Sequence, residues 1–365
     1  MSGLRIGVDT GGTFSDFVVL DEAAGRLDVF KMSSTPDAPE RAVLAGLDRA
    51  LGRCDGGAVD FFLHGTTVAT NALLERKVAR AGLVITEGFR AIYEVQEQAR
   101  PYGPPTFDLR HVRPPLLVPQ SRTVEVPERV GADGAVVTPL DEASARAALA
   151  ALAEQEVEAV AVCLLFSFLR PDHERRIRRL AAEILPGVPV SLSSDVAPVI
   201  REYYRLSTTV ANACLQPVVS DYLGRLEEGL TARGATTPRR YVMLSNGGVT
   251  PVAEAGAQAA STVLSGLAGG VVAAAGIAAR ARLANAIAFD MGGTSTDVAV
   301  IADGAPERRQ RSEIEGRPLA LATLGVDTLS AGGGALARID AARADELGAA
   351  RAGAAPGPAR SARGG

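Results

Sequence analysis

A short pattern of glycine and polar residues occurs twice in this 365-residue chain, and it constrains the fold more than any other feature. A constant offset of 281 residues aligns the two copies, the first near the N-terminus and the second at Asp290. The aligned pairs are Asp9 and Asp290, Gly11 and Gly292, Gly12 and Gly293, Thr13 and Thr294, and Asp16 and Asp297. Apolar runs flank both copies, so each predicts a strand, a tight turn and a second strand.

The two predicted turns have the chemistry of a phosphate site. Glycine adopts positive φ without steric cost and lets the backbone come close to a ligand. Successive amides of such a turn form a concave anion site, to which a Thr hydroxyl adds a donor. An Asp at the strand end can hold a hydrated Mg²⁺ near the phosphates. We therefore predict two hairpins that clamp one polyphosphate. The alternative is two ordinary hairpins whose Asp residues cap turns.

The two motifs also resemble known ones. Asp9–Thr13 and Asp290–Thr294 resemble the first and second phosphate motifs of the actin, hexokinase and Hsp70 ATPase superfamily. Within it the chain most resembles the hydantoinase/oxoprolinase family, including N-methylhydantoinase A-type subunits, over most of residues 4–340. The resemblance implies an α/β, two-lobed actin-like ATPase (ribonuclease H-like) fold with mixed sheets flanked by helices. We expect lobes at residues 1–190 and 191–340, with ATP and Mg²⁺ between them.

The resemblance also implies roles for the residues of the motifs. The residues expected to act in phosphoryl transfer are Asp9, Asp290, Thr13 and Thr294, with both Asp carboxylates holding Mg²⁺ through water. The residues expected to bind the nucleotide are Gly11, Gly12, Gly292 and Gly293. A later triple glycine, Gly332, Gly333 and Gly334, resembles the turn at which superfamily members seat the adenosine.

A predicted strand-to-helix corner carries the next group of polar residues. The run from His64 to Glu75 matches the family pattern His-Gly-Thr-Thr, Ala-Thr-Asn-Ala and Leu-Leu-Glu. Polar groups at such a corner often face a cleft, although a single histidine there is more often structural. The expected substrate contacts are His64, Thr66, Thr67, Asn71, Arg201 and Asn246. For Arg201 and the helix that follows it, a hydrogen-bond network is the alternative.

Periodicity predicts several further elements. Alternating helical and strand patterns between residues 142 and 192 predict a largely parallel sheet. Six prolines between Arg100 and Pro119 predict an extended excursion without a helix. His173, in a helical first turn, is expected to be solvated. Pro217 predicts a kink or break in the long helix that starts near Arg201.

The end of the sequence predicts disorder. Residues 341–365 contain ten Ala, five Gly and no aromatic residue, which leaves little bulky surface to offset ordering entropy. The stretch resembles an altered copy of a family segment, and related chains continue beyond it. We therefore expect a member of the family that is shortened at its C-terminus.

Composition limits the compartment and the partners. A formal net charge of −4 without a long basic run argues against nucleic acid as a partner. Residues 255–279 lack charge, but their many small residues favour a buried segment over a membrane span. The three cysteines are far apart and form no C-x-x-C pair, which fits a reducing cytoplasm.

The resemblance implies ATP-dependent opening of a cyclic amide such as a hydantoin or 5-oxoproline. Phosphorylation of the carbonyl oxygen would turn a poor electrophile into one with a leaving group. Because the sequence shows no metal cluster or nucleophile–base pair for the hydrolytic half, we expect a hydantoinase B-type partner subunit in a hetero-oligomer. Three alternatives stay open: a small-molecule kinase of the same superfamily, an acetone-carboxylase-type subunit, and a non-catalytic ATP-binding protein.

Overall fold

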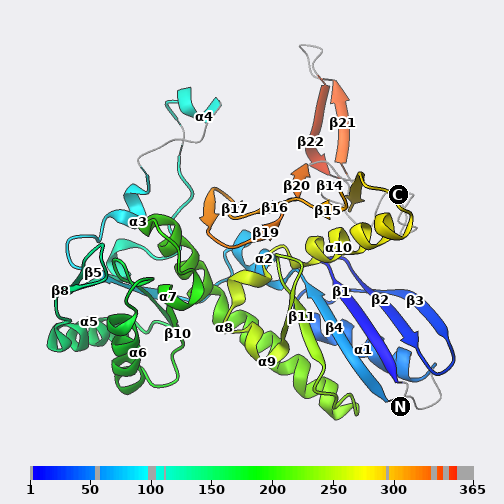
Figure 1. The fold of residues 1–365 in the computed structure, drawn as a ribbon, viewed down its shortest axis with the longest axis horizontal. Coiled ribbons are helices and arrows are strands. Elements are labelled where there is room, and N and C mark those ends of the chain that lie inside the picture. Colours follow the sequence, from blue (N-terminus) through cyan, green and yellow to red (C-terminus); the bar gives the residue numbers. More distant parts are fainter. Residues whose placement is uncertain are drawn as a thin grey trace.

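The computed structural model describes residues 3–53, 58–97, 104–110, 112–292, 296–329, 335–339 and 345–351. Two sheets with their covering helices make up most of the molecule, and a smaller third sheet lies beside them (Figure 1). A long helix, α8 (Glu202–Ala232), runs between the two larger sheets. No helix in the described residues combines the length and apolar character needed to cross a membrane.

The first sheet has six strands in the order β12-β11-β4-β1-β2-β3. Its members are β1 (Leu4–Thr10), β2 (Phe14–Asp21), β3 (Arg26–Ser33), β4 (Val59–Thr66), β11 (Arg240–Met243) and β12 (Val249–Pro251). β1 pairs antiparallel with β2 and parallel with β4, and β4 pairs parallel with β11. Leu4, Ile6 and Val8 alternate along β1 and are all buried, as the period of two in a strand requires.

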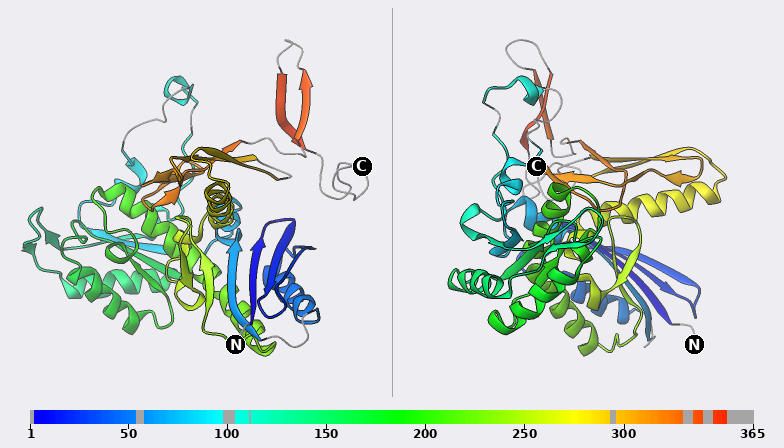
Figure 2. Two further views of the ribbon diagram at one scale, coloured as in Figure 1. Left: turned by 45° about the vertical axis from the view of Figure 1, so that its right-hand side comes forward. Right: turned by 60° about the vertical axis from the view of Figure 1, so that its left-hand side comes forward.

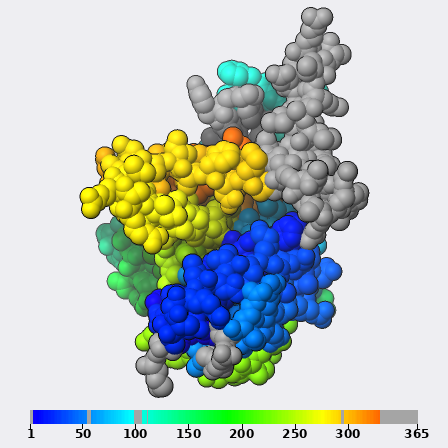
Figure 3. Space-filling model, turned by 90° about the vertical axis from the view of Figure 1, so that its right-hand side faces the viewer, coloured from blue at the N-terminus to red at the C-terminus, as the bar shows by residue number. Residues whose placement is uncertain are grey.

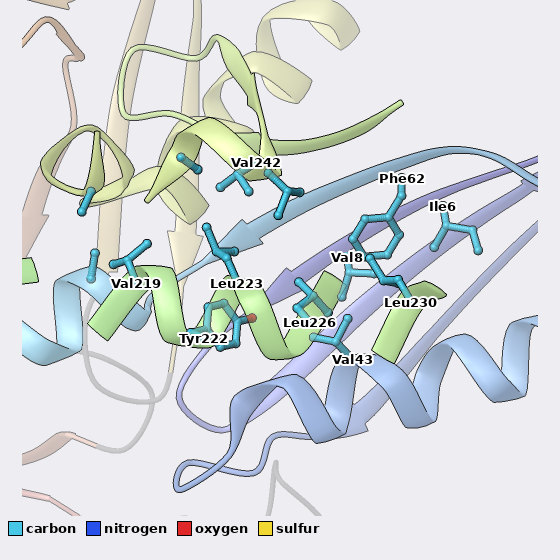
Figure 4. Packing of buried hydrophobic residues seen from close by; sticks show 14 of the residues in the cluster. Ile6, Val8, Val43, Phe62, Val219, Tyr222, Leu223, Leu226, Leu230 and Val242 are labelled. Carbon is cyan, nitrogen blue, oxygen red and sulfur yellow. The ribbon is translucent and has the colours of Figure 1, made fainter. Parts of the chain in front are cut away.

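Helices bury one face of this sheet. α1 (Pro39–Leu51) begins with a proline at a position where no intrahelical donor is needed, and it buries Val43 and Leu47. Figure 4 shows Val43 beside Leu226 and Leu230 of α8, over Ile6 and Phe62 of the sheet. This packing joins segments up to about two hundred residues apart into one hydrophobic core.

The second sheet is parallel, as the alternating pattern predicted. Its order is β10-β9-β5-β6, built from β5 (Ala81–Thr86), β6 (Thr123–Val126), β9 (Ala159–Cys163) and β10 (Val190–Leu192). α5 (Glu142–Glu154) and α6 (Asp172–Ile184) cover it, and Asp141 caps α5 by accepting from the amides of Ala143 and Ser144. The first half of α8 buries Val210 and Cys214 against β5 and β9.

The strand pairing does not follow the predicted lobe boundary at residue 190. β11 and β12 lie beyond that boundary in sequence, yet they extend the sheet that begins with β1. The reason is that α8 returns the chain to the first sheet after it has crossed the second one. The division into lobes at residues 1–190 and 191–340 stays a prediction. The pairing of β11 and β12 with the first sheet argues against its boundary at residue 190.

The third part of the molecule is the helix α10 (Ser265–Arg280) and a sheet laid along it (Figure 2). The sheet comprises β13 (Ala286–Met291), β14 (Thr296–Ala302), β15 (Ala305–Pro306) and β20 (Asp327–Leu329). Two-stranded ribbons follow: β16 (Arg308–Arg309) with β19 (Thr323–Leu324), β17 (Ser312–Ile314) with β18 (Arg317–Leu319), and β21 (Ala335–Ile339) with β22 (Asp345–Arg351).

Short elements complete the described chain. The helices are α2 (Val68–Leu74), α3 (Ile92–Val95), α4 (Pro104–Phe107), α7 (Ser193–Val196) and α9 (Val252–Ala255), with single 3₁₀ turns at Gln120–Arg122 and Ala259–Thr262. β7 (Arg129–Val130) and β8 (Val136–Thr138) form one more ribbon.

Four expectations from the sequence are corrected here. Residues 104–107 form one helical turn, α4, because proline is tolerated in the first turn of a helix. α8 continues through Pro217 without a break, since packing on both sheets holds it. Within 341–365, Asp345–Arg351 form β22, which gains backbone hydrogen bonds from β21. His173 is not solvated: its Nδ1 lies 2.7 Å from Oε2 of the buried Glu128.

The close packing of α1 on β2 gives a first prediction. A Cβ atom at Gly46 would lie 1.9 Å from Cζ of Phe17, whereas one at Gly224 of α8 would meet no atom within 4 Å. Gly46→Ala should therefore lower the free energy of unfolding by about 1–3 kcal/mol. Gly224→Ala should leave it unchanged or raise it by up to about 1 kcal/mol. Urea unfolding measures both variants, and equal effects would contradict this packing.

Candidate functional site

The first predicted loop is a hairpin between β1 and β2. Asp9 and Asp16 are directly opposite one another in the antiparallel ladder, and residues 11–13 make the turn between the strands. The amide of Gly11 donates to the carbonyl of Phe14 at 2.9 Å, which closes the turn. Lys31 of β3 forms an ion pair with Asp16, with 3.0 Å between Nζ and Oδ1. The hairpin thus places two carboxylates and one ammonium group around its turn.

Ser34 fixes the conformation of this turn from behind. Its hydroxyl donates to the carbonyl of Gly11 at 2.7 Å, and its amide donates to the carbonyl of Thr13 at 3.0 Å. The hydroxyl of Ser15 lies 3.1 Å from that of Ser34. The motif pattern did not identify Ser34, because it follows β3 and reaches the turn only through strand pairing.

The second copy of the motif forms the same kind of hairpin. Asp290 and Asp297 are opposite one another between β13 and β14, the positions that match Asp9 and Asp16. Thr328 of β20 donates to Oδ1 of Asp297 at 2.6 Å. Gly293 and Thr294 lie outside the described residues, as do Gly332, Gly333 and Gly334. The repeat found in the sequence is therefore also a repeat of strand register.

Two glycines leave the space that the Asp9 carboxylate occupies. A Cβ atom at Gly65 of β4 would lie 2.7 Å from Oδ1 of Asp9, and one at Gly266 of α10 would lie 3.1 Å from it. Any larger side chain at either position would push the carboxylate away. Gly266 lies in the first turn of α10, whose exposed amides favour a negative charge.

The aspartates of the two hairpins act on one another. Burial by the surrounding protein raises the pKa of Asp9 above its ordinary value, and the negative charges of Asp16 and Asp290 raise it further, while Lys31 opposes them. Burial also raises the pKa of Asp297, with the hydrogen bond from Thr328 acting against it and the charge of Asp290 adding to it. Burial is the largest cause of both shifts, and the smaller effect of Asp290 on each indicates that the two hairpins are near enough for their charges to interact, which a cation would relieve.

The start of α10 is attached to the corner between β4 and α2. The hydroxyl of Ser265 donates to the carbonyl of Thr66 at 3.0 Å, and the amide of Leu264 donates to Oγ1 of Thr70 at 2.9 Å. Leu264, the residue before α10, has a left-handed backbone conformation with φ of 62°. Figure 3 shows the segment of α10, in yellow, lying above the N-terminal strands in blue. The corner therefore positions α10 against Asp9.

His64 supports the corner from inside. Its side chain is completely buried, with Nδ1 3.2 Å from the carbonyl of Val8 and Nε2 2.6 Å from the hydroxyl of Tyr222. Because a carbonyl only accepts, Nδ1 is the donor, and the neutral ring accepts from Tyr222 at Nε2. Burial lowers the pKa of His64 to about 4. His64 and the buried Thr66 therefore have no surface for the substrate contact predicted for them.

The other predicted substrate residues divide between two places. Thr67 and Asn71 line an open cavity of about 780 Å³ that reaches Gly11 and Gly12 of the first turn. The Thr67 hydroxyl donates to the carbonyl of Thr10 at 3.2 Å and accepts from Asn71 at 3.1 Å.

Arg201 and Asn246 lie elsewhere. Arg201 is 3.4 Å from Glu97, and Asn246 accepts from the amide of Gly248 at 2.8 Å inside its own turn. The structure does not bring these two residues to the first turn.

A second cavity lies beside Asp290. It has a volume of about 260 Å³ between α10 and the second hairpin, and both Asp290 and Asp297 line it. Its other walls are small or apolar side chains, including Leu267, Ala274 and Phe289. A polyphosphate between the hairpins would thus have an apolar recess on the side of the second one.

Two family regions match this chain. The hydantoinase/oxoprolinase N-terminal region matches residues 5–185, and the hydantoinase/oxoprolinase domain matches residues 205–365. The chain therefore belongs to the hydantoinase/oxoprolinase family, as its motifs indicated.

Individual proteins give the same result. Caprolactamase subunit alpha from Pseudomonas jessenii is 36% identical over 97% of this chain and 51% of its own length. Acetophenone carboxylase gamma subunit from Aromatoleum aromaticum is 31% identical over 97% of this chain and 50% of its own. The crystal structure of ATP-dependent caprolactamase from Pseudomonas jessenii superposes with a TM-score of 0.84 at 34% identity, covering 99% of this chain and 53% of that one.

These matches confirm the predicted fold class, an α/β fold of the actin-like ATPase type with mixed sheets flanked by helices. The chain spans about half the length of the curated relatives it matches.

The space around Asp9 gives a second prediction. Gly266→Ala places a methyl group against the Asp9 carboxylate, so it should weaken binding of Mg-ATP by at least about tenfold, or roughly 1.4 kcal/mol. Gly276→Ala on the same helix is the control, because its Cβ would meet no atom within 4 Å. Calorimetric titration compares the two variants. Equal affinities would show that Asp9 does not depend on Gly266.

The buried histidine gives a third prediction. The pKa of His64 in the folded protein, about 4, is below its ordinary value of 6.5, so unfolding takes up a proton between these pH values. The neutral ring stabilises the fold fully above about pH 6.5, and this contribution falls by about 2 kcal/mol as the pH drops to 5.

Urea unfolding at pH 7.5 and pH 5 should show this loss in the native protein and not in His64→Gln. Because the comparison is a difference between two pH values, it is independent of any constant destabilisation by the substitution. An identical pH dependence in both proteins would contradict the buried neutral ring.

Proposed function

We propose that this chain binds Mg-ATP between its two hairpins and uses it to activate a cyclic amide, such as a hydantoin or 5-oxoproline, for ring opening. The observation that carries the proposal is the pair of matched hairpins, each with two opposed aspartates, whose charges act on one another. Structural repetition of this kind suits a ligand with a chain of phosphates. Membership of the family and the names of its relatives support the choice of reaction.

The residues fit magnesium held through water. Among the described residues, no three His, Cys, Asp or Glu side chains converge closely enough to ligate a metal ion directly. Magnesium in nucleotide sites usually keeps several waters and binds one or two carboxylates together with the phosphates. Burial raises the pKa of Asp9, and the charges of Asp16 and Asp290 add to this effect, so such an ion would balance negative charge at a partly desolvated carboxylate. Asp9 and Asp290 are the residues that would hold it.

The chain's own groups would position the phosphates. Gly11 and Gly12 of the first turn line the large cavity, and Ser34 holds that turn in place. We propose that Thr13 donates to a phosphate oxygen and that Thr294, with Gly292 and Gly293, does the same from the other side. Gly332, Gly333 and Gly334 are proposed to contact the adenosine. Such fixed donors stabilise charge that develops during phosphoryl transfer.

The proposed reaction begins at the carbonyl oxygen of the amide. That oxygen attacks the γ-phosphorus, the bond to the bridging oxygen breaks, and ADP leaves with the electron pair. Water then adds to the activated carbon, and the C–N bond opens to give a free amine, which takes up the proton, and an acyl phosphate. A second water hydrolyses the acyl phosphate to a carboxylate and inorganic phosphate. We propose that a hydantoinase B-type partner subunit performs this second half, because relatives are named as subunits and no metal cluster is found in the described part of this chain.

A second candidate is an acetone-carboxylase-type subunit, which would use the same ATP site to activate a ketone for reaction with bicarbonate. It is favoured by the similarity to a carboxylase subunit over 97% of this chain. A small-molecule kinase would share both hairpins and differ only in keeping the phosphate on its product. A non-catalytic ATP-binding protein would bind nucleotide without turnover.

One experiment separates these candidates. Phosphate release from Mg-ATP is measured with hydantoins, 5-oxoproline, a sugar, and acetone with bicarbonate, each with and without a candidate partner subunit. We expect release that depends on a cyclic amide and a ring-opened product only when the partner is present. Phosphate release that occurs only with acetone and bicarbonate would favour the carboxylase-type subunit. A stable phosphoester product would favour the kinase. Ring opening by this chain without a partner subunit would contradict the need for one.

The fourth prediction concerns Asp9 and Asp290, the matched aspartates of the two hairpins. Asp9→Asn and Asp290→Asn keep the shape of the side chain and remove its charge. Each should weaken Mg-ATP binding or slow its turnover by at least about tenfold, or roughly 1.4 kcal/mol. Asp303→Asn, in the turn between β14 and β15, removes the same charge away from the hairpin turns and should change neither. Unaltered binding and ATPase rates in both site variants would contradict the assignment.

A further inference from the structure

A cavity lined by arginines adjoins the large cavity at the first hairpin, with which it shares Val78, Ala79 and Glu158, but no described residue of either hairpin turn lines it. Its volume is about 300 Å³, and it opens between the segment after α2, the segment before β6 and the ribbon β17–β18. Four of its ten lining residues are arginine and one is a carboxylate: Arg76, Arg80, Arg122, Arg317 and Glu158. Nothing in the proposed reaction uses these side chains.

The fold holds two of these arginines in fixed positions. Nε of Arg122 donates to the carbonyl of Ala81 at 3.1 Å. Nη2 of Arg317 donates to the carbonyl of Pro115 at 3.0 Å, although the two residues are 202 positions apart. Gly316 makes this contact possible, because it turns the ribbon with φ of 72° and lies so close to Pro114 that a Cβ would be 2.9 Å from Cγ.

The charges of the cavity are only partly balanced. Arg80 has Glu156 at 3.4 Å and Arg317 has Glu315 at 2.8 Å. Within the described part of the chain, no ion pair closer than 4.0 Å involves Arg76 or Arg122. Arg122 donates instead to a backbone carbonyl, which neutralises no charge.

Two of the guanidinium groups, those of Arg122 and Arg317, approach the cavity from different segments. Arg317 is buried, and both groups act against the burial that raises the pKa of the nearby Cys214 thiol to about 12. Because Arg317 lies in the protein interior, the repulsion between the two groups is only partly screened by water. A bound anion would remove that repulsion.

We propose that this cavity binds a small oxyanion, a carboxylate or a phosphate. Planar guanidinium groups donate two parallel hydrogen bonds to such oxygens, which is the geometry that arginine is best suited to supply. The cavity is at the small end of the range for ligand sites, so it suits a compact anion. An anion there would join the N-terminal family region, which supplies three of the arginines, to the second region, which supplies Arg317.

The test uses inorganic phosphate and acetate as probes at constant ionic strength. Hydrogen exchange is followed in peptides that cover residues 114–122 and 312–319, and affinity is measured by calorimetry. We expect phosphate, acetate or both to slow exchange in these two peptides. The tighter of the two probes identifies the class of anion.

Three variants locate the site. Arg122→Gln should weaken binding by at least about tenfold, because a charge-assisted pair of hydrogen bonds is lost. Arg76→Gln, at an exposed position, should also weaken anion binding. This variant tests the site if Arg122→Gln does not fold. Arg146→Gln is the control, since Arg146 pairs with Glu183 at 2.7 Å on the surface of α5 and α6 and lies outside the cavity.

Three results would overturn the proposal. One is the absence of protection by either anion. Another is protection confined to peptides that contain Gly11 and Gly12, which would place the anion at the first hairpin. The third is equal affinity in the native protein, Arg122→Gln and Arg76→Gln. None of these results depends on ATP turnover, so failure here leaves the proposed function standing.

Discussion

The concentration of negative charge where the two hairpins meet is the constraint around which the candidate site is built. Asp9 faces Asp16 within its own ladder, and the charge of Asp290 reaches it from the second hairpin. Such an arrangement stores unfavourable electrostatic energy in the free protein. A bound cation with attached phosphates would make the electrostatic energy of these carboxylates favourable. Binding of such a ligand is therefore a physical reason for the fold to hold the carboxylates close together.

Two helices, α8 and α10, maintain this arrangement. α8 contributes to the cores of both large sheets, so it fixes the first hairpin relative to the parallel sheet. α10 starts on the corner at Thr66 and places Gly266 against Asp9 before the chain enters the second hairpin. His64 and Tyr222 connect the corner to α8 inside the protein. The position of the second hairpin thus depends on hydrogen bonds buried beneath the first.

The sequence predicted the parts that depend on local pattern. The alternating helical and strand patterns between residues 142 and 192 correctly predicted a parallel sheet, with α5 and α6 among its covering helices. The repeated motif predicted two hairpins facing one ligand, but it did not predict the part played by glycines at 65 and 266, which meet Asp9 only in three dimensions. His64 was assigned to the substrate because sequence does not reveal burial. Three further features were missed because each brings together segments that are far apart in sequence. They are the contact of Ser34 with the first turn, the contact of His173 with Glu128, and the arginine cavity.

A double-mutant cycle on Mg-ATP affinity tests the central claim, that the two hairpins form one site. Affinities are measured for the native protein, Asp9→Asn, Asp290→Asn and the double variant. If both carboxylates act on one bound ion, the double variant should lose less than the sum of the single losses, with a coupling energy of at least about 1 kcal/mol. Losses that add to within about 0.5 kcal/mol would show that the two hairpins act independently and would contradict the account.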